Sequence, residues 1–368
     1  MTALEVLRSV AAHGLPGHHG VHLTAPMDDP SWQELLQAVR RQRLAGLLMA
    51  TVEHEVLAVT DDQAEQVAEL HLQACATVLH LERRLLEVTA QLERAGIASV
   101  VLKGTALAHL SYPEPSLRLF GDNDLLLPGE RFDEAQQVLG ELGYRRPVRQ
   151  ARPDFDRRFG KGATLQGPDG DELDLHRTLV FGSFGFLIEP ETLFSTAVPF
   201  HLGGQTLRAL GPEARLLHAC YHAALGDPRP RYTSVRDVAQ LLAFGDHDSE
   251  AVLELLRRWC AEPVVARAAT LCRDHLGVDV SGLVVETARA HAPDRRARRA
   301  IDSYVGANRS FAAKVVASLP YLPGLRAKAA FLRAAALPDP AFAADQGTRG
   351  TLAWVRRGLR SLLRGRRG

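Results

Sequence analysis

The sequence predicts an α+β fold in which a small strand-containing core separates two helical regions. Apolar residues recur at spacings of three and four up to about residue 95 and again from about 212 to 337, as in amphipathic helices. Between these regions, short apolar runs alternate with glycine and proline, which is typical of strands and turns. We therefore divide the chain into an N-terminal helical region (1–95), an α/β core (96–205), a C-terminal helical domain (206–337) and a linker with a basic tail (338–368).

The N-terminal region is expected to contain amphipathic helices. One apolar pattern runs from Ser31 to Met49, with Ser31 as the N-cap, and a second runs from Asp61 to Ala95. Gly96 follows the second pattern and is placed to end its helix.

The core is expected to alternate strands and helices. In order, the sequence predicts a strand over 97–102, a helix over 104–110, a loop broken by two prolines over 112–116, a strand over 122–127, a helix ended by Gly143, and a hairpin of strands over 163–166 and 172–177.

The overall composition is that of an ordinary soluble globular protein, with 46% apolar and 24% charged residues. A formal net charge of +1 gives no general attraction to nucleic acid, so nucleic acid is a possible but not a favoured partner. The four cysteines lack CxxC spacing, which indicates neither a zinc knuckle nor a disulfide framework and favours the cytoplasm. The sequence contains no apolar run of about 18 residues, so no transmembrane span is expected.

Two aspartates carry the most specific chemical signal. Asp122 and Asp124 are two apart on a predicted strand, so their carboxylates share one face. Paired carboxylates favour Mg²⁺, or Mn²⁺, which takes its other ligands from water and substrate phosphates. Asp174, which shares a face with His176, supplies a third carboxylate if its strand lies alongside. Three carboxylates can hold two metal ions, with Asp174 as the candidate general base.

A second signal precedes these aspartates. A strand that ends in Lys103-Gly104-Thr105 at a helix start presents backbone N–H groups and a positive charge to a triphosphate. Arg118, just upstream of Gly121-Asp122, could neutralise a phosphate. Each feature alone is also consistent with a solvated turn or strand face. Their order in one short segment favours a metal–triphosphate site.

The motifs together resemble a bacterial family of uncharacterised nucleotidyltransferases within the polymerase-beta-like superfamily. The resemblance lies in Leu102-Lys103-Gly104-Thr105, Tyr112-Pro-Glu-Pro, the run from Leu117 to Leu127 with Gly121-Asp122-Asn-Asp124, Glu172-Leu-Asp174-Leu-His176, Leu217-His218-Ala-Cys-Tyr-His222 and Val235-Arg236-Asp237. It covers about residues 30–300. The superfamily has a Gly-Gly or Gly-Ser pair where this chain has Lys103-Gly104.

The resemblance implies a small mixed β-sheet and a magnesium-dependent transfer of a nucleoside monophosphate from NTP to an acceptor. Asp122, Asp124 and Asp174 match the three carboxylate positions. Members of this group often accompany natural-product gene clusters, which implies a small-molecule or peptide acceptor. The alternatives are transfer to a macromolecule such as tRNA or protein, and a non-catalytic NTP-binding module.

Further polar residues are candidates for the cleft. His218 and His222 are four apart on a predicted helix and could face it, although a packing role is as consistent. Ala219 stands where a metalloprotease motif needs glutamate, which disfavours zinc. Arg236 and Asp237 are candidates for either a structural ion pair or the cleft. The sequence leaves open whether Lys161 reaches phosphate and whether the arginine-rich tail is a plain disordered end or binds an anionic surface.

Overall fold

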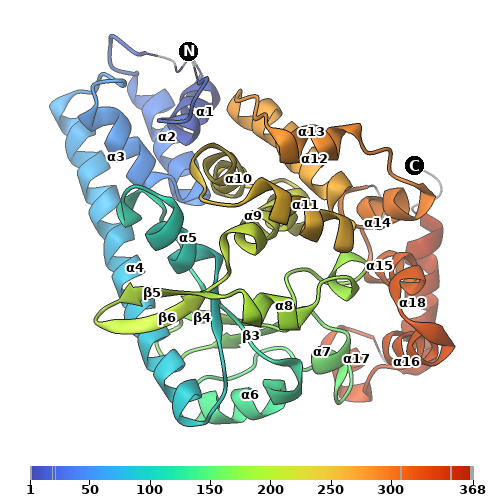
Figure 1. Cartoon of the computed structure of the whole chain (residues 1–368). Coiled ribbons are helices and arrows are strands. Elements are labelled where there is room, and N and C mark those ends of the chain that lie inside the picture. Colours follow the sequence, from blue (N-terminus) through green and yellow to red (C-terminus); the bar gives the residue numbers. More distant parts are fainter. Residues whose placement is uncertain (1, 19, 21, 307–308, 349, 365–368) are drawn as a thin grey trace.

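A six-stranded mixed sheet lies at the centre of the computed structural model, which describes residues 2–18, 20, 22–306, 309–348 and 350–364 (Figure 1). The strands are β1 (Val100–Leu102), β2 (Asn123–Leu126), β3 (Gly162–Gln166), β4 (Glu172–His176), β5 (Val198–Leu202) and β6 (Gln205–Ala209). Their order across the sheet is β3-β4-β2-β1-β6-β5. β2–β4 and β1–β6 are parallel and the other neighbours are antiparallel. The predicted α+β class with a mixed sheet and helical flanks is confirmed.

The N-terminal helices are α1 (Ala3–Ala12), α2 (Asp29–Gln42), α3 (Ala45–Glu53) and α4 (Asp61–Arg94). The expected N-cap at Ser31 is wrong: Asp28 is the N-cap of α2, and its carboxylate accepts the backbone N–H of Ser31. The pattern from Ser31 to Met49 also forms two helices instead of one. The chain breaks at Arg43, which takes a left-handed conformation with φ of 56°.

The two faces of the sheet are covered by different helices. The long helix α4 and α6 (Phe132–Gly140) bury Leu85, Val88 and Leu139 against one face, together with Val101 and Leu125 of the central strands. The other face, with Val100 and Leu126, joins a larger core that includes α1, α2, α9 and α10. Because side chains alternate along β2, Asp124 points to this second face.

The helices within and after the core complete the chain. They are α5 (Lys103–Ser111), η1 (Pro115–Leu117), η2 (Gly129–Arg131), α7 (Phe155–Arg158), η3 (Phe184–Phe186), α8 (Pro190–Ser195), α9 (Pro212–Tyr221), the π-helix η4 (His222–Gly226), α10 (Tyr232–Phe244), α11 (Ser249–Arg258), α12 (Glu262–Leu271), the π-helix η5 (Cys272–Leu276), α13 (Leu283–Ala290), α14 (Arg295–Val305), α15 (Phe311–Ser318), η6 (Leu319–Tyr321), α16 (Gly324–Ala336), α17 (Pro340–Asp345) and α18 (Thr351–Arg364). Within the described residues, no helix is both long and apolar enough to cross a membrane.

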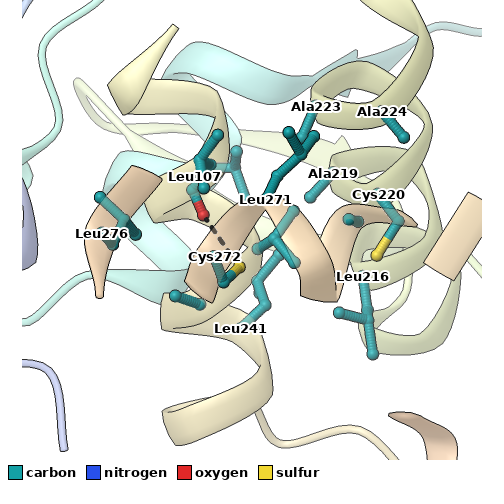
Figure 2. Packing of buried hydrophobic residues seen from close by; sticks show 14 of the residues in the cluster. Leu107, Leu216, Ala219, Cys220, Ala223, Ala224, Leu241, Leu271, Cys272 and Leu276 are labelled. Carbon is teal, nitrogen blue, oxygen red and sulfur yellow. Dashed lines mark hydrogen bonds between the residues drawn. The ribbon is translucent and has the colours of Figure 1, made fainter. Parts of the chain in front are cut away.

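Close apolar packing fixes α9 beside the core. Leu107 of α5, Leu216 and Cys220 of α9, and Leu241 of α10 are buried in the same cluster as Cys272 (Figure 2). The Cys272 thiol donates to the backbone carbonyl of Val235, as the dashed line shows. This packing sets α9 and η4 above the sheet face to which Asp124 points.

The β5–β6 hairpin is a feature that the sequence prediction missed. Two glycines, Gly203 and Gly204, connect the strands, and both have positive φ values of 52° and 80°. A Gly-Gly pair between alternating segments is a hairpin signal of the two-residue type, so the information was present in the sequence. β6 pairs with β1, so the sheet continues beyond residue 205, where the core was predicted to end.

The C-terminal segment, which was expected to be a linker with a basic tail, forms helices. α17 and α18 occupy this segment, and α18 packs against α15 and α16. Arg366 and Arg367 of the predicted basic tail lie outside the described residues.

Candidate active site

Two aspartates lie next to each other on neighbouring parallel strands. The register of β2 and β4 places Asp124 directly beside Asp174, and the side chain of His176 shares their face. One ligand atom from each of these three residues lies within 4.8 Å of the others. Asp124 is buried, whereas Asp174 is partly exposed and accepts a hydrogen bond from the Thr164 hydroxyl at 2.5 Å. The two strands therefore lie side by side, as the three-carboxylate hypothesis requires.

The third carboxylate, Asp122, differs from the expectation in its local structure. It comes one residue before β2 and not within it, because β2 begins at Asn123. Its Oδ1 atom accepts a hydrogen bond from Nη1 of Arg43 at 3.0 Å. Asn123 points the other way and donates to the carbonyl of Leu81 in α4. Asp122 thus flanks the group of Asp124, Asp174 and His176 and is held by a residue from the N-terminal helices.

Lys103 is directed at the same carboxylates. Its Nζ lies 2.7 Å from Oδ1 of Asp124. The backbone of Lys103 has a φ of 39°, a left-handed value that side-chain-bearing residues rarely adopt and that is often found at functional sites. Burial lowers the pKa of Lys103, but the adjacent Asp124 carboxylate outweighs burial and holds that pKa above its usual value. The lysine therefore remains charged in the site.

The two glycines and the threonine next to these residues serve close packing. A Cβ on Gly104 would lie 3.0 Å from the ring of Phe120, so this position brings α5 close to the segment before β2. Thr105 is buried inside α5. A Cβ on Gly121 would lie 2.7 Å from Nη2 of Arg43, so the guanidinium occupies the space that this glycine leaves open.

Asp124 stays ionised despite its burial. Burial raises its pKa, but Lys103 and the hydrogen bond from His176 outweigh burial and hold the pKa well below the usual range. The His176 contact joins Nε2 to Oδ1 of Asp124 at 2.8 Å, while its Nδ1 is buried with no hydrogen-bond partner among the described residues. Burial and the nearby Lys161 lower the pKa of His176, so the ring is neutral at neutral pH.

Lys161 is a second lysine beside the carboxylates, and it is half-buried. Burial and the charge of Lys103 lower its pKa, while Asp124, Asp174 and Asp122 oppose that shift. It lies in the short segment that leads into β3, where a Cβ on Gly162 would meet the carbonyl oxygen of Leu175 at 1.8 Å. The Gly-Lys-Gly sequence therefore lets the backbone approach β4 closely enough to bring Lys161 to the site.

The paired histidines extend the site toward the C-terminal helices. His218 lies on α9 and His222 begins η4, where the helix widens to a π-helix. Burial lowers both pKa values well below the usual one, and the charge of Lys103 adds to the effect. His176 also lowers the pKa of His218, so these imidazoles are electrostatically coupled to the carboxylate group and are uncharged.

Three of the predicted site residues bond to partners inside the protein: Arg118, Arg236 and Asp237. Arg118 donates through Nε and Nη2 to both oxygens of Asp237 at 2.6 and 2.8 Å, and through Nη1 to the Leu119 carbonyl. This corrects the expectation that Arg118 reaches a phosphate, because its guanidinium is buried and occupied. Arg236 donates to the carbonyls of Ala11 and His13 and to Gln240, so it joins α10 to the N-terminal region. The structural interpretation of Arg236 and Asp237 matches these contacts.

The donor set at the sheet face fits a divalent cation. Asp124 and Asp174 offer hard oxygen ligands, which Mg²⁺ and Mn²⁺ prefer, and His176 lies with them, its Nε2 bonded to Asp124. Lys103 already shares Oδ1 of Asp124, so a cation that bound there would compete with the ammonium group for this oxygen.

Arg43 is the residue of this site that sequence analysis missed. It lies 79 residues before Asp122 in the chain, within what was taken as one continuous helical pattern. No motif marks it, because arginine is common on helix surfaces. The break between α2 and α3 has no glycine, asparagine or proline to signal it.

The comparisons with known proteins place the chain in a family. Residues 28–277 match a family model described as "Uncharacterised nucleotidyltransferase". The chain is also similar to two solved structures of the antibiotic-resistance factor ANT(2'')-Ia, one in solution and one in complex with adenylyl-2''-tobramycin. Identity is 17% in both, TM-scores are 0.35 and 0.31, and the match covers 54% and 52% of this chain and 97% of each of those chains.

A third solved structure, an antigenic nucleotidyltransferase-like protein from Paracoccidioides brasiliensis, is 16% identical with a TM-score of 0.33 and covers 56% of this chain and 95% of its own. No curated protein matches the sequence. The family match includes Lys103 and the three aspartates and spans more than half of the chain. The chain therefore belongs to the family of uncharacterised nucleotidyltransferases.

Proposed function

We propose that this nucleotidyltransferase moves a nucleoside monophosphate from NTP to a hydroxyl group of a small molecule or peptide and releases pyrophosphate. The observation that carries the proposal is the pairing of Asp124 with Asp174 on neighbouring strands, with Lys103 and Lys161 beside them. Carboxylates and lysines on one face suit a substrate that carries both divalent metal and polyphosphate.

The residues that would hold magnesium or manganese are Asp122, Asp124 and Asp174. Three carboxylates could hold two such ions. When bound, the metal neutralises triphosphate charge and lowers the pKa of the acceptor hydroxyl. Each of the three carboxylates accepts a hydrogen bond from a neighbouring side chain: Asp122 from Arg43, Asp124 from His176 and Asp174 from Thr164.

The chain's own residues supply binding and proton transfer. Lys103 and Lys161 bind the phosphates, and Asp174, the more exposed of the paired carboxylates, accepts the proton of the acceptor hydroxyl. A bond forms between the acceptor oxygen and the α-phosphorus, and the bond from that phosphorus to the pyrophosphate oxygen breaks. His218 and His222, which are uncharged, line the acceptor side and can exchange hydrogen bonds without adding charge.

Nucleotide binding is the first test, because it does not require knowledge of the acceptor. We expect a thermal shift with at least one NTP that depends on Mg²⁺ and grows with its concentration. Asp124→Asn should abolish this shift, whereas Asp246→Asn, at an exposed position after α10, should leave it intact. The absence of a shift with all four NTPs in the wild type would contradict the proposal.

Turnover is the second test. Pyrophosphate release should appear with a panel of hydroxyl-bearing small molecules and peptides, and Asp174→Asn should lower it by about two to four orders of magnitude. Radiolabel from the NTP that stays on tRNA or protein would identify a macromolecular acceptor instead.

The four cysteines are free, which supports our assignment of the protein to the cytoplasm.

A further inference from the structure

We propose that Arg43 is a nucleotide-binding residue that holds Asp122 in the absence of NTP and transfers to the polyphosphate when metal and NTP bind. The proposal rests on the proposed function, because it assigns one more residue to the same site. It would make the N-terminal helices part of the nucleotide site, to which the sequence motifs assign only the core.

The position of Arg43 is fixed by its neighbours. The side-chain oxygen of Gln42 accepts a hydrogen bond from the backbone N–H of Tyr232 at 2.9 Å. The backbone carbonyl of Gln42 accepts one from the Thr233 hydroxyl. On the other side, a Cβ on Gly46 would lie 1.9 Å from the carbonyl oxygen of Ser116, so α3 packs closely against the segment that leads to Asp122. The backbone at Arg43 is thus anchored from two directions, and its side chain is the part that can move.

The backbone conformation of Arg43 is unusual for its residue type. Its φ of 56° at the C-terminus of α2 is the left-handed conformation that glycine or asparagine normally supplies. A simple helix stop would be better served by either of these residues. Lys103, the cation that contacts Asp124, has the same kind of backbone. The two cations that contact Asp122 and Asp124 directly, Arg43 and Lys103, therefore both do so from a left-handed backbone.

The contact between Arg43 and Asp122 is suited to exchange. Their side chains are 34% and 30% exposed, and among the described residues only Nη1 of Arg43 makes a hydrogen bond. The Arg118–Asp237 pair is the opposite case, because its side chains are 7% and 2% exposed and two nitrogens engage the carboxylate. A half-exposed, single contact contributes little to stability, so a better partner can displace it.

Metal and NTP together supply that better partner. A divalent cation that binds Asp122 competes with the guanidinium for the same carboxylate charge. The triphosphate brings several negative oxygens, which the planar guanidinium can engage with two nitrogens at once. Arg43 then opposes metal binding without nucleotide and favours it with nucleotide, so the two ligands bind together. A purely structural ion pair would not couple them.

The test compares metal and nucleotide binding in variants of Arg43. Arg43→Gly suits the left-handed backbone and removes the charge, and Arg43→Lys keeps the charge without the planar fork. Arg41→Ala removes an exposed arginine two residues away on the last turn of α2 and is the matched control. Mn²⁺ binding without nucleotide is followed by electron paramagnetic resonance of the free ion, and binding of each Mg-NTP by titration calorimetry.

We expect Arg43→Gly to bind Mn²⁺ alone several-fold more tightly and Mg-NTP about tenfold more weakly than the wild type. Arg43→Lys should lie between the two, and Arg41→Ala should match the wild type. An unchanged affinity of Arg43→Gly for Mg-NTP would overturn the inference and leave the proposed function standing. If the wild type binds no Mg-NTP at all, the proposed function fails, and this inference fails with it.

Discussion

At the scale of single residues, the site is defined by charges held in compensating pairs, which are buried at Asp124 and partly exposed at Asp122. Asp124 accepts contacts from Lys103 and His176 through the same oxygen, and Asp122 is held by Arg43. Isolated charges would be costly at this depth, and the pairing lowers that cost. The charge of Lys103 and the hydrogen bond from His176 hold the pKa of Asp124 well below its usual range, so this buried carboxylate stays ionised.

A prediction about backbone strain follows for Arg43. Arg43→Gly and Arg43→Val both remove the ion pair with Asp122, but only glycine relieves the left-handed backbone. Glycine should leave the free energy of unfolding within about 1 kcal/mol of the wild type, because the exposed ion pair is worth roughly 0–1 kcal/mol. Valine should be less stable than glycine by about 1–2 kcal/mol. Urea denaturation of both variants measures the difference, and equal stabilities would contradict strain at this position.

A second residue-scale prediction concerns pH. Burial holds the pKa of His218 well below 6.5, so the folded protein keeps it neutral while the unfolded chain takes up a proton as the pH falls below about 6.5. The unfolded state then binds more protons, so the free energy of unfolding decreases as the pH is lowered from 7 to 5. His218→Asn should reduce this slope by up to about 1.4 kcal/mol per pH unit.

Chemical denaturation of the wild type and His218→Asn at pH 7, 6 and 5 checks this. His291→Asn, on an exposed position after α13, is the matched control and should keep the wild-type slope. Identical slopes in the wild type and His218→Asn would show that His218 does not titrate differently on unfolding.

At the scale of elements, the register of β2 and β4 decides the site. A shift by one residue would turn Asp124 toward α4 and separate it from Asp174. Asn123, which donates to the Leu81 carbonyl in α4, fixes which face of β2 Asp124 occupies, and Gly162 against the Leu175 carbonyl sets how closely β3 approaches β4.

A pair of glycine substitutions tests the close approach at the strand. Gly162→Ala would place a Cβ 1.8 Å from a backbone oxygen, so β3 must move away and carry Lys161 with it. We expect the free energy of unfolding to fall by at least about 1–3 kcal/mol and NTP binding to weaken. Gly140→Ala meets nothing within 4 Å at the end of α6, has a right-handed backbone, and should stabilise by about 0.5–1 kcal/mol. Thermal unfolding of both variants distinguishes the two sites.

The Arg118–Asp237 pair carries a further prediction at this scale. Asp237 also accepts the hydroxyl of Tyr112, so it joins the segment before β2 to α10. Asp237→Ala leaves Arg118 buried without its partner and should cost about 3–5 kcal/mol. Asp246→Ala, at an exposed position after α10, should change stability by less than about 0.5 kcal/mol. A small effect of Asp237→Ala in denaturant unfolding would contradict the assigned structural role.

At the scale of the whole molecule, helices that lie before and after the sheet in sequence share one core. The helices α1 and α2 lie on the same side of the molecule as α10 (Figure 1). Residues of α1 and α2 belong to the same buried cluster as residues of α9, α10 and α12, and Arg236 bonds to carbonyls at the end of α1. We therefore propose that the N-terminal region and the C-terminal helical domain unfold together, although they are separated by the core in sequence.

Trp32→Ala tests this cooperation. Trp32 is fully buried in α2, and its truncation should cost about 3–5 kcal/mol. If the shared core is one cooperative unit, hydrogen exchange should become faster by the same factor in α2, α10 and α12. Faster exchange confined to α1–α3 would show that the N-terminal helices open independently.

The order of the chemical residues followed from the sequence because it depends on local periodicity. Alternation along a strand places Asp174 and His176 on one face wherever the strand lies, and the step from the apolar strand to Lys103-Gly104 marks the start of a helix. The α+β class followed in the same way from the change of apolar period near residue 97. These features are set by residues a few positions apart.

Only the tertiary structure decided which charges meet. Arg118 was expected at a phosphate but pairs with Asp237, 119 positions away, while Arg43 reaches Asp122 across 79 positions. Spacing along the chain says nothing about such partners, because they depend on how helices pack against the sheet. The sequence by itself determined the fold class of this protein and the strand faces that carry its carboxylates; packing determined which arginine contacts Asp122 and which one pairs with Asp237.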